Sequence, residues 1–404
     1  MKSTMIRFKK EDGSSYPDWK ECKLGDLYTE RNERGNDSLP ILSVSIHDGV
    51  SSGEMDEEEL GKKVNRSSDK TLYKRVCPGD LAFNMMRAWQ GAIGVVKTEG
   101  MISPAYIAAI PNEELYAPFM NYYMRTDRMI HIINRQSYGL TDFRKRLYWD
   151  SFVNIPCSIP CIEEQKRIAD FLDHLDEQIE VQKKVVADYE LRRSEILRRV
   201  FLQEIRFYGS DGNPFPEWKP HALSYYLVER REKYTGIEEV YSVSVSKGLV
   251  NQSEHLGRSF AAENLDNYKV VHFGDVIYTK SPTGKFKWGI VKQSAEENTV
   301  VISPLYGVFV PQNYEIGFLL DQYFSSPERA HNYLITLITK GAKNTINISN
   351  DTFLSKEIAL PAVAEEQKIV AEFLRTINEQ VNTESDILNR LELLKKGFLQ
   401  KMFI

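Results

Sequence analysis

The stretch Pro160-Cys161-Ile162-Glu163-Glu164-Gln165-Lys166 returns later in the chain as Pro361-Ala362-Val363-Ala364-Glu365-Glu366-Gln367-Lys368. Each copy opens a segment without proline, from about Ile162 to Arg206 and from about Val363 onward. Apolar residues in both segments are spaced alternately four and three apart, which is typical of a coiled-coil seam. We therefore predict two long helices, each roughly 60 Å long at 1.5 Å per residue.

The segments before these two openings also resemble each other. The offset between matching residues stays between 195 and 202, as expected of one duplicated module with small insertions and deletions. The matching pairs, in order, are Tyr16-Pro17-Asp18-Trp19 with Phe215-Pro216-Glu217-Trp218, Ser43-Val44-Ser45 with Ser242-Val243-Ser244, Gly79-Asp80 with Gly274-Asp275, and Ile102-Ser103-Pro104 with Ile302-Ser303-Pro304. Short β-branched and aromatic runs between Gly, Pro and Asn indicate that this part of each copy is α+β.

We expect an α+β fold with an internal two-fold repeat. Its parts are a globular domain at 1–161, a long helix at 162–207, a second globular domain at 208–362 and a second long helix at 363–404. The organisation is close to circular, because Ile6-Arg7-Phe8 matches Ile205-Arg206-Phe207, just past the first helix. The two ends of the chain should therefore lie near each other.

A two-fold axis across the helices would make them antiparallel. Centring the overlap places Arg193 against Glu384 and Gln182 against Lys395, and polar residues at seam positions often fix register. The alternative is that each helix covers only its own domain.

Composition excludes several classes of protein. The chain has 404 residues, is 42% hydrophobic and 27% charged, and is therefore globular. Its 52 basic and 57 acidic residues give a formal charge of -5, so it does not coat nucleic acid by bulk charge. No apolar run approaches the roughly 20 residues that span a bilayer, and four cysteines are too few for a disulfide scaffold. We expect a cytoplasmic protein with no membrane contact.

Catalytic and metal-binding signatures are absent from the sequence. No Gly-x-Gly loop follows a predicted strand, and Gly284-Lys285-Phe286 lacks the other residues of a phosphate loop. Cys157 and Cys161 with His174 would need further ligands to hold zinc, and the second copy has Ile358 and Ala362 instead. We predict no catalytic residue and no metal site.

Basic and amide side chains cluster at matching places in both copies. Such clusters are common on solvated surfaces, but their recurrence favours contact with base edges and phosphates of double-stranded DNA. The candidate DNA-binding residues are Asn84, Arg87, Gln90, Arg135, Arg144, Lys145 and Arg146 in the first copy, and Thr279, Lys280, Lys285, Lys287, Lys340, Lys343, Asn344 and Asn347 in the second. The acidic stretch from Glu54 to Glu59 should face away from DNA.

The chain resembles the specificity (S) subunits of type I restriction–modification systems over nearly its full length. The resemblance depends on the Pro-x-Trp openers, the two helix openings quoted above, and the strings Gly-Asp-Leu-Ala-Phe-Asn (79–84), Met-Arg-Ala-Trp-Gln-Gly-Ala (86–92), Ser-Pro-Ala-Tyr (103–106) and Arg-Leu-Tyr-Trp-Asp-Ser-Phe (146–152). The second copy lacks the Met-Arg-Ala-Trp-Gln-Gly string, which implies a different recognition class for that half.

The resemblance implies a non-catalytic subunit. Each globular domain would be a target recognition domain for one half of a bipartite, asymmetric DNA site. The helices would set the gap and dock two methyltransferase (M) subunits, and restriction (R) subunits would complete the assembly. S-adenosylmethionine, ATP and Mg would be bound by those partners. The alternatives are a protein-binding coiled-coil adaptor, a DNA-binding adaptor of another defence system, and an enzyme whose catalytic motif is not recognisable.

Overall fold

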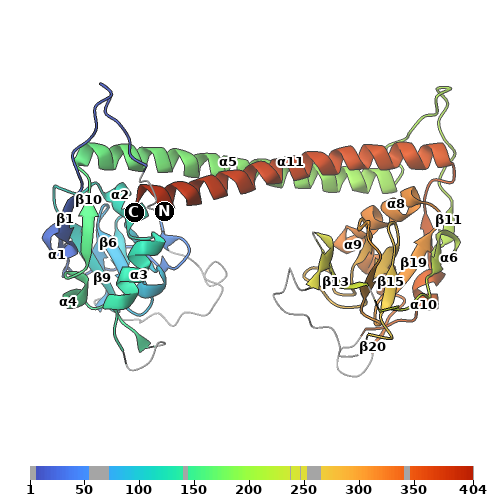
Figure 1. Ribbon diagram of the computed structural model, residues 1–404, viewed down its shortest axis with the longest axis horizontal. Helices are drawn as coiled ribbons and strands as arrows, with labels where there is room; N and C mark the ends of the chain where they lie inside the picture. The colour runs from blue at the N-terminus through green and yellow to red at the C-terminus, as the bar shows by residue number, and fades with distance from the viewer. Residues whose placement is uncertain are drawn as a thin grey trace. The chain divides into compact units, whose positions relative to one another are not determined.

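The computed structural model describes residues 6–53, 72–139, 144–236, 238–245, 247–252, 265–340 and 346–403. Contacts divide the chain into two units. The first unit comprises Met1–Lys183 with Asp386–Ile404, and the second comprises Lys184–Ser385. Each unit therefore combines a globular part with portions of both long helices, α5 (Ile162–Phe201) and α11 (Ala364–Met402) (Figure 1).

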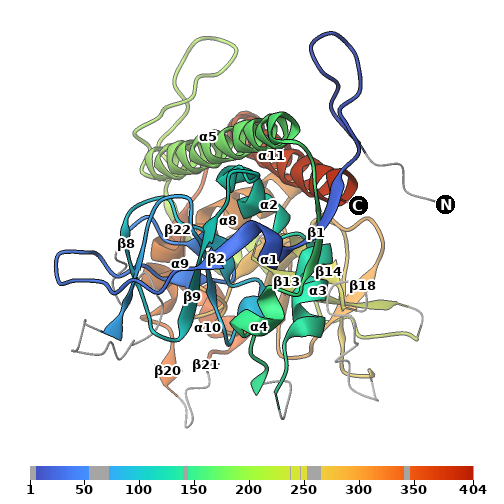
Figure 2. The same cartoon turned by 90° about the vertical axis from the view of Figure 1, so that its left-hand side faces the viewer.

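The globular part of the first unit, which faces the viewer in Figure 2, is built around a four-stranded antiparallel sheet in the order β2-β9-β6-β7. Its central strand β6 is buried along its whole length. In chain order the elements are β1 (Lys20–Lys23), α1 (Leu24–Leu27), β2 (Tyr28–Glu30), β3 (Val44–Ser45), β4 (Gly49–Val50), β5 (Lys74–Val76), β6 (Leu81–Asn84), the 3-10 turn η2 (Ala88–Gln90), β7 (Ile93–Val95), β8 (Gly100–Ile102), β9 (Tyr106–Pro111), α2 (Ala117–Tyr123), α3 (Asp127–Gln136), α4 (Trp149–Phe152) and β10 (Pro156–Ile159).

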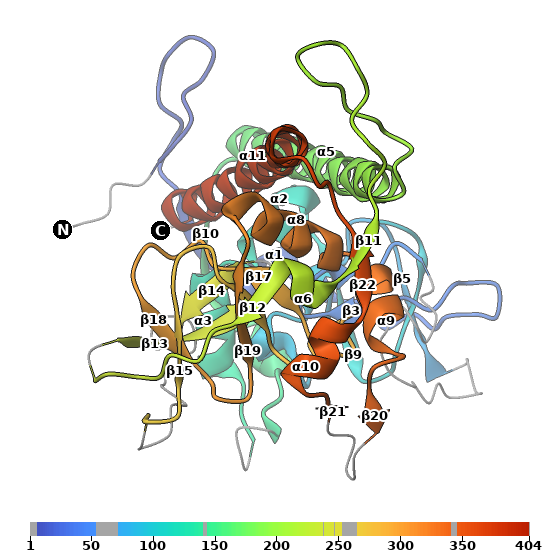
Figure 3. The same cartoon turned by 90° about the vertical axis from the view of Figure 1, so that its right-hand side faces the viewer.

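The second unit repeats this plan with the sheet order β12-β19-β16-β17 (Figure 3). Its elements are β11 (Pro220–Ala222), α6 (Leu223–Tyr226), β12 (Leu227–Glu229), β13 (Glu239–Ser244), β14 (Gly248–Asn251), β15 (Lys269–Val271), β16 (Val276–Tyr278), β17 (Val291–Gln293), β18 (Val300–Ile302), β19 (Gly307–Pro311), α8 (Tyr314–Phe324), α9 (Pro327–Leu334), β20 (Thr339–Lys340), β21 (Ile346–Asn347), α10 (Asn350–Ser355) and β22 (Glu357–Ala359). The mixed α+β class and the internal repeat are confirmed.

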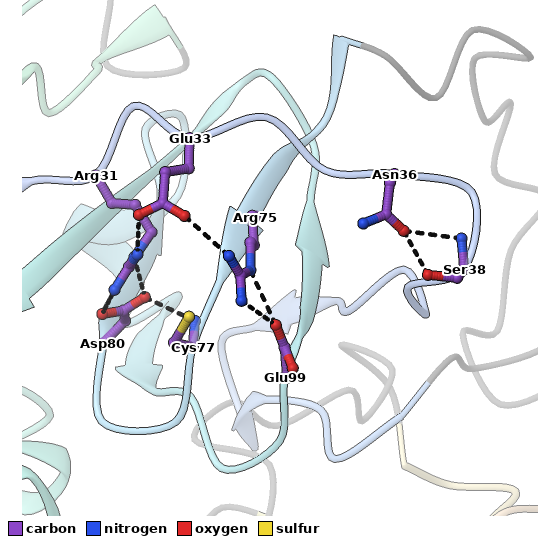
Figure 4. A network of polar contacts seen from close by, with 8 residues as sticks. All are labelled: Arg31, Glu33, Asn36, Ser38, Arg75, Cys77, Asp80 and Glu99. Carbon is purple, nitrogen blue, oxygen red and sulfur yellow. Dashed lines mark hydrogen bonds and ion pairs between the residues drawn. The ribbon is translucent and has the colours of Figure 1, made fainter.

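The frame residues of the repeat make the same contacts in both units. In the first unit the guanidinium of Arg31 holds the buried carboxylate of Asp80 by two hydrogen bonds of 2.6 and 3.1 Å. In the second, Arg230 holds Asp275 at 2.6 and 2.9 Å. A buried charge is stable only when it is paired, so each ion pair fixes the residue that directly follows β2 or β12 against the turn that carries the aspartate. Figure 4 shows the first pair and its continuation across the surface through Glu33, Arg75 and Glu99.

The repeated helix openings are explained by their glutamines. The side-chain amide of Gln165 donates to the carbonyl of Pro160 at 2.9 Å, and that of Gln367 donates to Pro361 at 2.8 Å. Each glutamine also accepts a hydrogen bond from its globular part. In the first unit the donor is the backbone amide of Tyr116, at 2.8 Å. The Glu-Gln-Lys signature thus joins the start of each long helix to the domain before it.

Portions of both long helices run antiparallel within each unit. In the first unit Phe171 of α5 packs edge-on against Phe398 of α11, with ring centroids 4.8 Å apart. Backbone near the two ends of the chain is joined there too, because the Ile6 amide donates to the Lys401 carbonyl at 3.0 Å. The antiparallel arrangement and the near-circular organisation are confirmed.

The predicted register of the helices is wrong by six residues. Arg193 donates to Asn378 at 2.5 Å and not to Glu384, and Lys395 forms an ion pair with Asp176 in place of Gln182. Glu384 and Gln182 have other partners. The apolar seam alone does not define the overlap of the two helices. In the structure a third polar group from the globular part joins each pair. This group is Gln322 of α8 in the second unit and Tyr122 of α2 in the first.

Candidate nucleic-acid interface

A tight turn between β6 and β7 presents the first basic group of the first unit. The backbone amide of Gln90 donates to the Arg87 carbonyl at 2.9 Å, which closes the 3-10 turn η2. Residues three apart on such a turn lie on the same side, and both Arg87 and Gln90 are exposed. Ala88 between them is buried, and the Trp89 indole donates to the Met86 carbonyl at 3.0 Å. The turn is therefore anchored from beneath, with its arginine and glutamine facing solvent.

The second basic group of the first unit lies beside this turn. Tyr138 and Arg146 exchange backbone hydrogen bonds of 3.1 and 3.0 Å, and the Leu147 amide donates to the Met85 carbonyl at 2.9 Å. The ammonium of Lys145 lies 5.8 Å from the ring centre of Trp89. The structure thus brings together two groups that are separated by some 50 residues of sequence. The exposed members of the second group are Arg135, Arg144 and Arg146.

Some of the predicted contact residues face the protein. Asn84 is only 7% exposed and accepts a hydrogen bond from the Met86 amide at 3.0 Å. Lys145 also donates to Asn134 at 3.3 Å. In the second unit Thr279 is 2% exposed and accepts from the Ile290 amide at 3.1 Å. These side chains form hydrogen bonds within their own unit.

The corresponding turn of the second unit follows β16. Phe286 is buried, while its neighbours Lys285 and Lys287 are exposed, so the two lysines project on either side of an apolar anchor. Thr283 and Phe286 exchange backbone hydrogen bonds of 2.9 Å, which closes the tip of the turn. The Trp288 indole donates to Nδ1 of His331 on α9 at 3.1 Å.

Two further predicted residues of the second unit lie on a β-ribbon. Lys340 lies on β20 and Asn347 on β21, which pair antiparallel. Lys343 and Asn344 lie outside the described residues, as does the acidic stretch from Glu54 to Glu59.

Sequence reasoning missed Lys269 on β15. Its ammonium donates to the carbonyl of Tyr306 at 2.7 Å, beside the end of β16 from which Lys280 follows. Burial lowers the pKa of both lysines, and the charge of Lys269 lowers the pKa of Lys280 further. Lys269 stands in a strand otherwise made of valines, eleven residues before Lys280, so neither clustering nor spacing signals it.

The part of the chain that the structure describes contains neither a candidate metal site nor a helix that could span a membrane. No group of three or more His, Cys, Asp or Glu side chains is placed to hold a metal ion there. The sulfur atoms of Cys22 and Cys157 lie 3.5 Å apart on the paired strands β1 and β10, as free thiols. None of the described helices is both long and apolar enough to cross a membrane.

Comparison with known proteins identifies the class. Residues 88–187 and 240–393, more than half of the chain, match the family described as type I restriction modification DNA specificity domain. The chain therefore belongs to this family, whose role is DNA recognition. Specificity subunits of the family are generally non-catalytic, in agreement with the absence of a catalytic signature from the sequence.

Two solved structures share the fold over almost the full length. One, from work on complex assembly and conformational transition of a type I R-M system, is 16% identical with a TM-score of 0.56, and the match covers 96% of this chain and 98% of that one. The other is a type I restriction-modification S subunit from M. genitalium, 11% identical with a TM-score of 0.55, covering 99% of both chains. At such identities the likeness establishes the fold alone.

Proposed function

We propose that this chain is the sequence-specific DNA-recognition subunit of a type I restriction–modification complex, and that each globular part reads one half of a bipartite, asymmetric site. One observation carries the proposal. The same frame, marked by the Arg31–Asp80 and Arg230–Asp275 pairs, holds a basic turn after β6 and after β16, and the exposed side chains of the two turns differ. A common frame with different contact residues is what two readers of different sequences require.

The types of side chain exposed on the two turns support DNA as the ligand. Arg87 and Gln90 are of the types that bind guanine and adenine edges in the major groove. Lys285 and Lys287 carry compact charges suited to phosphate oxygens. We include in the proposed interface the exposed residues Arg87, Gln90, Arg135, Arg144, Arg146, Lys285 and Lys287, and leave out Asn84, Lys145 and Thr279, which are engaged within their units.

The long helices are proposed to set the gap between the half-sites and to dock two methyltransferase subunits. Their surfaces carry apolar side chains that water covers in the isolated chain, including Leu191 on α5, 70% exposed, and Leu393 on α11, 67% exposed. Leu394, next to Leu393 on α11, is 47% exposed, and neighbouring exposed apolar groups on a helix are typical of a partner surface. The S-adenosylmethionine, ATP and Mg of the reaction would be bound by the methyltransferase and restriction subunits, leaving this chain non-catalytic.

The same exposed leucines fit the alternative of a protein-binding coiled-coil adaptor. That alternative predicts a complex without sequence-dependent DNA binding, and it predicts no effect of removing Arg87 or Lys285 on any DNA-dependent readout. An adaptor of another defence system would bind DNA but would not direct adenine methylation.

Sequencing of methylated bases tests the proposal. The chain is expressed with its cognate adenine methyltransferase subunit, and each is also expressed alone. A split motif that appears only when both are present is expected. A soluble, assembled complex that leaves no new motif would contradict the proposal and favour the protein-binding adaptor. Arg87→Ala should weaken DNA binding by the complex while assembly stays intact.

A further inference from the structure

The backbone of Lys280 adopts a conformation that side chains disfavour. Its φ is +53°, and among the described residues other than glycine only Gln203 shares a positive value. A Cβ atom is strained in this left-handed region. The chain is also crowded here, because a Cβ added to Gly289 would lie 2.9 Å from the Lys280 nitrogen. Residues held in such conformations cluster at functional sites. The strained backbone therefore makes Lys280 a candidate functional residue.

The loop around Lys280 is clamped at its base. The Tyr278 hydroxyl donates to the Trp288 carbonyl at 2.7 Å. Thr279 donates its amide to the Ile290 carbonyl at 3.0 Å and accepts the Ile290 amide on its hydroxyl at 3.1 Å. Three hydrogen bonds thus join the two sides of the loop directly below Lys280. The surrounding structure, and not the preference of lysine, imposes the strained conformation.

A second lysine converges on the same place. The Lys269 ammonium, carried by β15, donates to the Tyr306 carbonyl at 2.7 Å. Tyr306 precedes Gly307, which pairs with Tyr278 at the end of β16. Lys280 follows two residues after Tyr278, so both lysines belong to the same end of the sheet, and the charge of Lys269 acts on Lys280 by lowering its pKa. Both side chains are half-buried.

The two lysines carry positive charge that no ion pair with a described residue neutralises. In the described part of the chain, neither Lys269 nor Lys280 forms an ion pair, and burial lowers the pKa of both. The carboxylate of Glu229 raises the pKa of each lysine. Glu229 is already engaged, because it accepts a hydrogen bond from Asn350 and lies 3.8 Å from Arg231. Two half-desolvated cations side by side favour a bound anion.

The first unit lacks this pair of lysines at the corresponding positions. Lys74 occupies the place of Lys269 in the repeat, and Met85 occupies the place of Lys280. Lys74 lies 3.8 Å from Glu30, the counterpart of Glu229. The frame therefore needs neither the second lysine nor the strained backbone, and both are additions of the second unit.

We propose that Lys269 and Lys280 form a phosphate site of the second unit, which holds one phosphodiester of the DNA backbone. The inference deepens the proposed function and rests on it. Lysine presents a compact point charge, which suits a phosphate oxygen better than the two-point recognition of a base edge. The site fixes the second unit on the duplex, while sequence is read elsewhere in the unit.

Lys280→Gly tests the site, because glycine adopts a positive φ without strain. The variant is assembled with the methyltransferase subunits, and its affinity is measured against salt for a duplex that carries the methylated motif and for a scrambled duplex. Loss of one phosphate contact reduces the slope of log affinity against log salt by about 0.9. Both duplexes should weaken by the same factor and the methylated motif should be unchanged. The thermal midpoint of the variant should equal or exceed that of the wild type.

Two further variants define the controls. Lys269→Met should reproduce the loss of slope, whereas Lys219→Ala, which removes an exposed lysine beside β11, should leave the slope unchanged. An unchanged slope in Lys280→Gly would overturn the phosphate site. A relaxed motif with an unchanged slope would show that Lys280 reads a base, and a failure to assemble would show a structural role. A wild-type complex that binds both duplexes equally would contradict the proposed function instead, while the slope still tests the phosphate site.

Discussion

At the scale of single residues, the two copies satisfy one frame position in different ways. In the second unit the Trp218 indole donates to the buried Glu366 carboxylate at 2.8 Å. Burial raises the pKa of Glu366, and its other oxygen has no hydrogen-bond partner among the described residues. In the first unit the matching Glu164 is held by Arg7 at 2.7 and 3.0 Å. The Trp19 indole nitrogen is buried there and has no partner in the part of the chain that the structure describes. Identical residue types thus have different energetic roles.

This difference predicts an asymmetric response to one substitution. Trp218→Phe leaves the Glu366 carboxylate without its donor, which costs about 1–3 kcal/mol beyond the lost packing. Trp19→Phe is made at a less buried position and removes a donor for which no described residue is a partner. We expect Trp218→Phe to lower the free energy of unfolding by about 1–3 kcal/mol more than Trp19→Phe, measured by urea denaturation. Equal losses would show that the indole bond is energetically neutral.

The candidate residues show what clustering in the sequence can and cannot predict about side-chain exposure. Arg87, Gln90, Lys285 and Lys287 are exposed on clamped turns, as expected of contact residues found by clustering. Clustering cannot tell a side chain that faces solvent from one that packs inward, so it also selected Asn84, Lys145 and Thr279. It missed Lys269, which only the fold brings to Lys280.

At the scale of the elements, three polar side chains tie each helix pair to its globular part. In the second unit Arg193 of α5 donates to Asn378 of α11 at 2.5 Å and to Gln322 of α8 at 3.1 Å, and Asn378 donates to Gln322 at 3.1 Å. The matching triad of the first unit is Tyr122, Asp176 and Lys395, joined by a 2.8 Å hydrogen bond from the phenol and by the Lys395–Asp176 ion pair. Each triad requires one relative position of three elements, and therefore fixes register.

A neighbouring arginine offers a matched test of the second triad. Arg193→Met keeps the aliphatic stem and leaves the Asn378 and Gln322 oxygens with fewer donors, which should cost about 1.5–3 kcal/mol. Arg192 forms an exposed pair with Asp188 at 2.8 Å on the same helix, so Arg192→Met should cost less than about 0.5 kcal/mol. Chemical denaturation of both variants checks the difference. Similar costs would mean that the apolar seam alone sets the register.

The apolar seam explains why the helices could be predicted but their register could not. A spacing of four and three repeats every seven residues, so sliding one helix by about two turns brings apolar positions back into contact. The choice between such registers depends on Gln322 and Tyr122, which come from helices of the globular parts. Nothing in the sequence of α5 or α11 signals those partners.

At the scale of the whole molecule, each unit completes its core with the end of the helix that follows the other copy. In the first unit Phe403, just after α11, packs against Trp19 with ring centroids 6.4 Å apart. In the second unit Phe201, at the end of α5, packs against Trp218 at the same distance. Because each junction is an aromatic contact of the common frame, a recognition domain should be exchangeable if the donor keeps the aromatic residues that receive the helix end.

Exchange of residues 1–161 for the corresponding segment of a relative with a different motif tests whether the halves read DNA independently. The donor segment should retain aromatic residues at the positions of Trp19, Phe119 and Tyr123, which contact Phe403. We expect the chimera, expressed with the methyltransferase subunit, to methylate a hybrid motif with one half replaced and the other half and the gap retained. Exchange of 208–362 should replace the opposite half. A chimera that assembles but loses both halves of the motif would show that recognition is shared between the units, because independent readers lose only the contacts of the exchanged domain.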